Sequence, residues 1–169
     1  MTVHHTSTGH FFEDFVKGDV YEHGVGRTIT TTDNIWFTLL TQNPAAAHLD
    51  PHFAAQTEFG KPLVNSTLTF ALVNGQSVRD ISHNVIASLG WDDVKIPNPV
   101  FEGDTVYSRT EIVDKRESKS RPHAGLLTVR TEGFNQDGTT IMTFQRTVMV
   151  YKKGQRPSTA GDAGSDGTT

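Results

Sequence analysis

The sequence of 169 residues has no cysteine, which excludes disulfides, thiolate zinc sites and cysteine nucleophiles. No stretch approaches the roughly 18 apolar residues that a membrane-spanning helix needs, and no apolar run follows a basic start. Basic residues are not in excess, since 15 Lys and Arg stand against 19 Asp and Glu, so a basic face for nucleic acid is lacking. We therefore expect a cytoplasmic protein that binds neither membranes nor nucleic acid.

The length corresponds to one domain of ordinary size between two polar ends. Residues 1–10 show no apolar periodicity, so a flexible arm explains His4 and His5 better than a metal site does. Residues 154–169 are dominated by Gly, Ser, Thr, Ala and Asp, which bury too little apolar surface to fold. The sequence thus predicts a flexible N-terminal arm, a single domain over residues 11–153 and a disordered tail.

Hydrophobic periodicity predicts helices in the first half of the domain and strands in the second. The expected elements are a strand at 20–29, a helix that begins within 30–33 and ends at 40, a short helix from 51, a helix at 63–78, and strands at 85–91, 105–113, 126–134 and 140–151. The first helix is expected to bury an apolar face, since Ile35 and Leu39 lie four residues apart, as do Trp36 and Leu40.

Apolar residues surround the helix at 63–78, which we therefore expect to be buried on nearly all sides. The later strands alternate with period two, and Asn135–Gly138 is a hairpin turn signal between the last two. Helices followed by a run of strands indicate an α+β domain, in which one antiparallel sheet curls around the buried helix.

A short polar elbow separates the first two helices. Pro44 cannot continue the first helix because it has no N–H to donate. Asp50 and Pro51 have the residue types of an N-cap and of a first helical position. Asn43 and His48 therefore lie between two helix ends, where catalytic side chains can be aimed rigidly.

The elbow and the segment after it resemble the motif of the MaoC-like dehydratase family, the (R)-specific enoyl-CoA hydratases and their relatives. That motif is Asp-x-Asn-Pro-x-His-x-Asp-Pro, then about a dozen residues, then His-Gly at the start of the central helix. His48 and Asp50–Pro51 match it. Asn43 stands at the place of the catalytic Asp, and Asn65–Ser66 stand at the place of His-Gly.

The segment 98–104 is similar to the family's Pro-Val-x-x-Gly-Asp turn, so the resemblance covers about residues 12–152. It implies a hotdog fold, an antiparallel sheet wrapped around a long buried helix. It also implies a hydro-lyase that reversibly adds water to a 2-enoyl-CoA thioester. No metal or redox cofactor is implied, because the substrate itself carries coenzyme A.

Hydration requires a base that deprotonates water, an acid that protonates the α-carbon and donors for the enolate oxygen. A lone histidine is more often structural, but the spacing of His48 from Pro44 and from Asp50–Pro51 favours a catalytic base. Asn43 cannot carry a proton. Three alternatives follow: His48 performs both proton transfers, which we favour, another acid replaces Asn43, or the protein binds an acyl-CoA without turnover.

Three further residues are expected to contact the substrate. The resemblance places Ser66 where a backbone N–H binds the developing oxyanion, and Asn65 and Ser66 also fit a plain helix cap. Asn74 falls where family members carry a polar residue that faces the pocket, and a polar group in so apolar a helix needs a partner or a cavity. Asp50 is expected to be structural, and His52 a surface or capping residue.

The form of the elbow resembles relatives that act on short, branched or dicarboxylic acyl-CoAs such as mesaconyl-CoA. One alternative is a catalytically silent acyl-CoA-binding or partner subunit. Another is a hotdog thioesterase, which would want a carboxylate that residues 63–79 do not offer. We also expect a homodimer, because a single sheet leaves unpaired strand edges and a two-fold axis would pair two of them.

Overall fold

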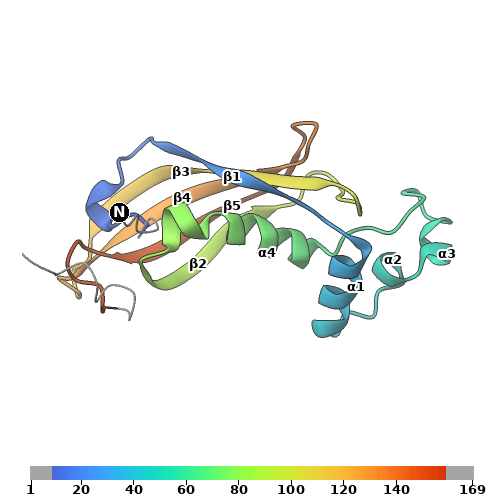
Figure 1. Ribbon diagram of the computed structural model, residues 1–169, viewed down its shortest axis with the longest axis horizontal. Helices are drawn as coiled ribbons and strands as arrows, with labels where there is room; N and C mark the ends of the chain where they lie inside the picture. Colours follow the sequence, from blue (N-terminus) through green and yellow to red (C-terminus); the bar gives the residue numbers. More distant parts are fainter. Residues whose placement is uncertain (1–8, 159–169) are drawn as a thin grey trace, which may run out of the picture.

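The computed structural model describes residues 9–158, which form one curled antiparallel sheet with a helix lying across its concave side (Figure 1). The elements are, in chain order, η1 (Phe12–Asp14), β1 (Val20–Thr28), α1 (Thr31–Leu40), α2 (Ala46–Leu49), α3 (Pro51–Ala54), α4 (Ser66–Gln76), the π-helical turn η2 (Val78–Ser82), β2 (Val85–Lys95), β3 (Thr105–Glu117), β4 (Ala124–Phe134) and β5 (Thr140–Tyr151). This arrangement confirms the predicted α+β hotdog fold.

The five strands have the order β1-β3-β4-β5-β2, so β1 and β2 form the two edges. The predicted hairpin joins β4 and β5 at Asn135–Gly138, where the Asn135 Oδ1 accepts hydrogen bonds from the backbone N–H groups of Asp137 and Thr139. Gly138 has a φ of 77°, a conformation that glycine adopts without steric cost. The Asn135 side chain and Gly138 thus fix the turn between β4 and β5 and with it the register of these two strands.

The apolar core forms two clusters on the concave face of the sheet. One lies between α4 and the strands and includes Val73, Met142 and Phe144. The other lies beneath η1, where Phe12 and Phe15 cover the far ends of β4 and β5. β5 carries Met142, Phe144, Val148 and Val150 at alternate positions into these clusters, as a strand with one buried face should.

The prediction that the central helix is buried on nearly all sides is wrong for the single chain. Leu68, Thr69 and Val73 face the sheet and are buried, but Ala71 and Gly75 on the opposite side of α4 are exposed. The reason is geometric, because one sheet covers only one face of a helix.

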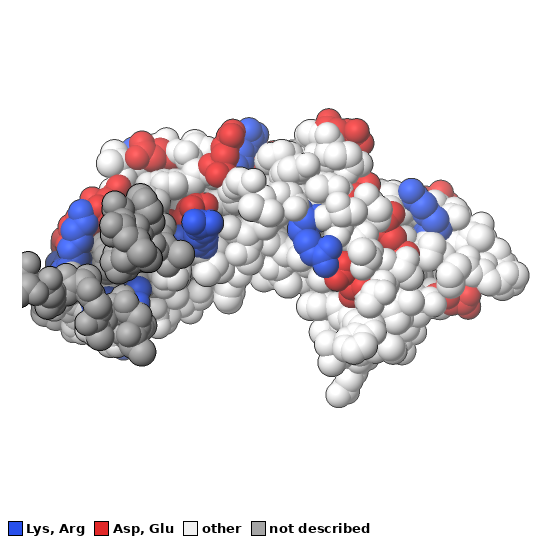
Figure 2. Space-filling model, in the orientation of Figure 1, with Lys and Arg blue, Asp and Glu red and all other residues white. Residues whose placement is uncertain are grey.

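The prediction that α1 buries an apolar face is also wrong. Its buried residues are the polar Asn34 and Thr38, whereas Trp36, Leu39 and Leu40 are 67%, 60% and 76% exposed. The helix contacts the domain through hydrogen bonds of Asn34 and through the half-buried Phe37, which packs against the core. The helix itself projects beyond the end of the sheet (Figure 1). The projecting tip carries no charge in the space-filling view, where basic and acidic side chains are otherwise interspersed (Figure 2).

The described chain extends past both predicted domain boundaries. His10, which the sequence assigns to the arm, places its Nδ1 2.9 Å from the carbonyl of Asp80. Arg156 in the predicted tail donates to Asn84 Oδ1 at 2.8 Å. His4 and His5 lie outside the described residues. Among residues 9–158, no helix is long and apolar enough to cross a membrane, and no cluster of three metal-binding side chains occurs.

Candidate active site

The elbow begins where α1 ends. α1 starts with a reciprocal cap, in which Thr30 Oγ1 accepts from the N–H of Asp33 and the Asp33 carboxylate accepts from the N–H of Thr30. The Thr30 hydroxyl and N–H thereby lower the pKa of Asp33. At the other end Gln42 takes a φ of 55°, which turns the chain so that the N–H of Asn43 donates to the carbonyl of Thr38.

His48 lies on a short helix, α2, which the sequence reading missed because four residues are too few for a periodic signal. α3 follows at once and begins as predicted, with Asp50 as the N-cap that accepts from the N–H of Phe53 and with Pro51 at the first helical position. His52 on α3 is exposed, as expected. The helical turn that contains His48 and the one that follows it therefore fix the backbone at His48.

A fully buried asparagine, Asn34, connects α1 to the rest of the site. Its Nδ2 donates to the carbonyl of Leu63 at 3.0 Å and also lies near the carbonyl of His48 and the Glu102 carboxylate. Its Oδ1 accepts from the N–H of Asn65 at 2.9 Å. One side chain thus joins the elbow, the chain before α4 and the α4 cap. The sequence reading overlooked it, although an amide inside an apolar helical stretch is a signal that could have been used.

The ring of His48 has a fixed tautomer. Its Nδ1 lies 2.9 Å from the carbonyl oxygen of Leu63, which can only accept a hydrogen bond. In the neutral ring, Nδ1 therefore carries the proton and Nε2 has the lone pair. A half-buried imidazole held in this tautomer is equipped to take a proton from water.

The start of α4 presents a free donor close to this ring. Asn65 is the N-cap, and its Oδ1 accepts from the N–H of Thr67 while its Nδ2 donates to Thr38 Oγ1. Both ends of this buried amide are therefore used within the protein. The N–H of Ser66, the first helical residue, has no acceptor within residues 9–158, as expected at a helix N-terminus.

His48 and Ser66 line one cavity of about 320 Å³. The rest of its wall is mostly apolar and is made by Phe59, Leu63, Val64, Thr69, Ile96, Pro97, Asn98, Pro99 and Val100. The hydroxyl of Thr69 is buried and has no hydrogen-bond partner among residues 9–158. A base and an N–H donor on an apolar cavity suit an acyl thioester, whose carbonyl is the polar group that needs a donor.

Asn43 and Asn74 are not among the residues that line this cavity. The Oδ1 of Asn43 accepts from the N–H of Ala45 at 3.0 Å, so it shapes the elbow, and its Nδ2 has no partner within the described residues. Asn74 lies farther along α4, where its Oδ1 accepts from the guanidinium of Arg146 at 2.7 Å. Burial of this guanidinium lowers the pKa of Arg146 to about 10.

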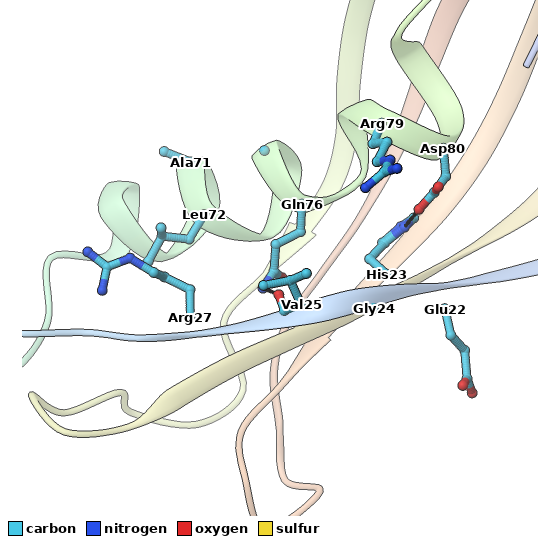
Figure 3. A pocket seen from close by; sticks show the side chains of 11 residues that line it. Glu22, His23, Gly24, Val25, Arg27, Ala71, Leu72, Gln76, Arg79 and Asp80 are labelled. Atoms are coloured by element: carbon cyan, nitrogen blue, oxygen red, sulfur yellow. Dashed lines mark hydrogen bonds and ion pairs between the residues drawn. The ribbon is translucent and has the colours of Figure 1, made fainter. Parts of the chain in front are cut away.

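A larger cavity than the one beside His48, of about 740 Å³, lies between β1 and α4 (Figure 3). It contains a buried histidine, His23, whose Nδ1 lies 2.7 Å from the Asp80 carboxylate. The His23 Nε2 lies 2.9 Å from the hydroxyl of Thr110, which in turn contacts Thr131. Both ring nitrogens are thus occupied, so His23 offers no free lone pair, and we place the candidate active site at His48.

The fold and the site together define a MaoC-like hotdog protein, and comparisons with known proteins agree. A MaoC domain protein dehydratase of Chloroflexus aurantiacus superposes with a TM-score of 0.85 at 32% identity, over 93% of this chain and 45% of that chain. A Mycobacterium tuberculosis protein described as having a double hotdog fold superposes with a TM-score of 0.80 over 91% of this chain and 48% of that one. At 24% identity the latter shows the fold alone.

The family model described as mesaconyl-CoA hydratase matches residues 2–169, and the chain belongs to this family. It is 33% identical to mesaconyl-CoA hydratase of Cereibacter sphaeroides over 148 residues, which are 88% of this chain and 43% of the relative. It is 31% identical to the (R)-specific enoyl-CoA hydratase of Aeromonas caviae over 114 residues, 68% of this chain and 81% of the relative. The chain thus spans less than half of the first relative and most of the second.

Proposed function

We propose that this protein is a hydro-lyase that reversibly adds water to a short 2-enoyl-CoA thioester, with mesaconyl-CoA as the first candidate. The observation that carries the proposal is the pairing of two groups on one apolar cavity: the unprotonated Nε2 of His48 and the free N–H of Ser66. The names of the relatives support the reaction class.

In the proposed reaction, His48 Nε2 removes a proton from a water molecule while the oxygen of that water bonds to the β-carbon of the substrate. The electron pair of the double bond moves towards the thioester oxygen, and Ser66 N–H and the N-terminus of α4 stabilise the enolate charge. His48 then returns the proton from Nε2 to the α-carbon, so one residue performs both transfers. The product is the 3-hydroxyacyl-CoA, and the imidazole ends neutral.

The other predicted site residues receive supporting roles in this proposal. Asn43 does not line the cavity, so we assign it an indirect role: its Oδ1 shapes the elbow that positions His48, and its amide cannot replace an acid. Asn65 acts through position, because its cap fixes the first turn of α4 and so the direction of the Ser66 N–H. Asn74 contacts the acyl group farther along the helix. The reaction uses no metal or redox cofactor, and the cytoplasmic location remains a prediction from sequence.

We further propose that the chain works as a homodimer. The edge strand β2 exposes Leu89, Trp91 and Val94, and these side chains are about half exposed. An edge with unpaired backbone groups and apolar side chains favours strand pairing across a two-fold axis. The Mycobacterium tuberculosis protein that is described as having a double hotdog fold supports this arrangement, because this chain covers 48% of it and a second copy would supply the second hotdog unit.

The alternative is a catalytically silent acyl-CoA-binding subunit, which Asn43 favours because this residue replaces the family's acid and its Oδ1 is used by the elbow. The hotdog thioesterase alternative lacks a supporting observation, because no carboxylate lines the cavity of His48.

One assay separates these functions. Purified protein is mixed with mesaconyl-CoA or crotonyl-CoA, and loss of the absorbance of the conjugated thioester is followed. We expect turnover, and we expect His48→Ala to lower it by about 10²–10⁴-fold. His52→Ala is the matched control, because His52 is an exposed histidine only four residues away, and it should retain full activity.

Light scattering at the assay concentration gives the mass of the active species. We expect twice the chain's 18.6 kDa. If folded wild type binds acyl-CoA but shows the same negligible turnover as His48→Ala, the hydratase proposal is refuted and the silent acyl-CoA-binding subunit takes its place. Full activity at 18.6 kDa would refute the dimer.

A further inference from the structure

The concave face of the sheet holds one buried cation. Arg146 lies near the middle of β5 and is 1% exposed. Its Nη1 donates to Asn74 Oδ1 at 2.7 Å and its Nη2 to Ser77 Oγ at 3.1 Å, while its Nε has no acceptor in the described part of the chain. No ion pair within residues 9–158 includes it. A buried guanidinium without a carboxylate is costly, so a charge-complementary ligand is the first explanation to test.

The partners of Arg146 fix the orientation of the Asn74 amide. Asn74 Oδ1 accepts from Arg146 and, at 3.4 Å, from the indole Nε1–H of Trp91 on the neighbouring strand β2. The flipped amide would turn its own N–H groups against these two donors. Nδ2 must therefore point away from the guanidinium, and it has no hydrogen-bond partner within the described residues.

Asn74 thus offers two N–H donors that are oriented and polarised by a charge directly behind them. Such a donor favours an anionic acceptor over a neutral one. Asn74 is half-buried whereas Arg146 is fully buried, so an incoming ligand meets the amide first and the guanidinium acts through it.

The position of Asn74 on α4 relates this donor to the proposed active site. Ser66 and Asn74 are eight residues apart, which is about 12 Å along the helix axis. A hydrogen bond of about 2.9 Å at each end leaves roughly 6 Å for the ligand, the span of a chain of about four to six carbons that carries an oxygen at each end. Phe70 lies between the two positions on the same helix and packs its ring against Trp91 and Phe144, which makes the intervening surface apolar.

We propose that Asn74, held by Arg146, binds the free carboxylate at the far end of a short dicarboxylic acyl chain whose thioester oxygen lies at the N–H of Ser66. Asn74 is then a specificity-determining residue, and Arg146 is a positioning residue that also supplies the opposite charge. This inference rests on the proposed function for the site of the thioester, but the recognition itself does not require turnover.

The test uses saturated CoA thioesters, which cannot be hydrated. Calorimetry measures the dissociation constants of succinyl-CoA and butyryl-CoA, which share four carbons and differ in a terminal carboxylate, and of adipyl-CoA and hexanoyl-CoA as a longer pair. For wild type we expect the dicarboxylic member of at least one pair to bind more tightly. Arg146→Met should lower that preference by about 100-fold, the effect of one nearby charge in a partly screened site, and should leave the neutral member unchanged.

Arg116→Met is the matched control, since Arg116 is an exposed arginine on β3, and it should keep the preference. Asn74→Asp guards against a variant that fails to fold, because it gives Arg146 an internal carboxylate. We expect this variant to melt at a higher temperature and yet to lose the preference for the dicarboxylic member.

Equal binding within both pairs in folded wild type would overturn the inference, and so would an Arg146→Met variant with an unchanged preference. An equal loss for acid and neutral members in Arg146→Met would assign Arg146 a structural role only. If the preference holds but neither unsaturated ester is hydrated, the proposed reaction fails while the recognition stands.

Discussion

The replacement of Asn34 by leucine would test how the site is held together. Leucine has the same branched side-chain skeleton, with two larger methyl groups in place of the amide oxygen and nitrogen, and forms no hydrogen bond. The buried N–H of Asn65 would lose its acceptor and the carbonyl of Leu63 one of its two side-chain donors. One buried donor left unsatisfied costs about 1–3 kcal/mol, so with the other lost contacts we expect the free energy of unfolding to fall by about 2–4 kcal/mol.

Thr38→Val is the comparison for this variant, because it removes only the hydroxyl that accepts from Asn65 Nδ2. We expect it to cost about 1 kcal/mol. For a domain of this size, each kcal/mol lowers the melting temperature by about 2–4 °C, so the two variants are separable by circular dichroism.

Asn34→Leu should also lower kcat for hydration more than Thr38→Val does, at a temperature where both are folded. The reason is that the Leu63 carbonyl holds the ring of His48, and Asn34 is its second anchor. A variant that loses stability but keeps wild-type kcat would refute this link. A loss of stability no larger than that of Thr38→Val would refute the central place of Asn34.

Two further predictions concern stability. Hydrogen bonds from the Thr140 hydroxyl and from Arg109 lower the pKa of Glu132. The contribution of ionised Glu132 to folding stability is therefore present above the usual glutamate range and is lost as pH falls through the lowered pKa. The stability of Glu132→Gln, measured by chemical denaturation, should depend less on pH below about 5 than that of wild type. A Cβ at Gly133 would lie 2.5 Å from a methyl group of Val73, so Gly133→Ala should lower the free energy of unfolding by about 1–3 kcal/mol. A Cβ at Gly75 meets nothing within 4 Å, so Gly75→Ala should be neutral or should stabilise the fold by up to about 1 kcal/mol. Equal melting temperatures for the two variants would contradict this packing.

The sheet could be predicted from the sequence because β3, β4 and β5 carry the period-two pattern over much of their lengths. β5 was expected at 140–151 and is found at Thr140–Tyr151, whereas β2 and β3 continue past their predicted ends. These extensions run into polar residues, where periodicity gives no signal and pairing with a neighbouring strand decides the boundary.

The candidate site was predicted in its residues but not in all of its contacts. His48, Ser66 and the cap at Asp50 followed from local motifs, which act over a few residues. The bond from His48 Nδ1 to Leu63 spans fifteen residues and depends on how two segments pack. No spacing rule gives such a distance, so the tautomer of His48 could not be derived from sequence.

The residues that the sequence reading missed are those that break an expected pattern. In β5 the even-numbered positions from Met142 to Val150 face the core, and Arg146 occupies one of them. In α1 the buried positions carry Asn34 and Thr38, while Trp36, Leu39 and Leu40 are exposed and Phe37 is only half-buried. A polar residue at an inward position costs stability unless something compensates it. For Asn34 the compensation is a closed set of hydrogen bonds within the chain. For Arg146 the Nε donor has no acceptor among the described residues, which is why its complement is sought in a ligand.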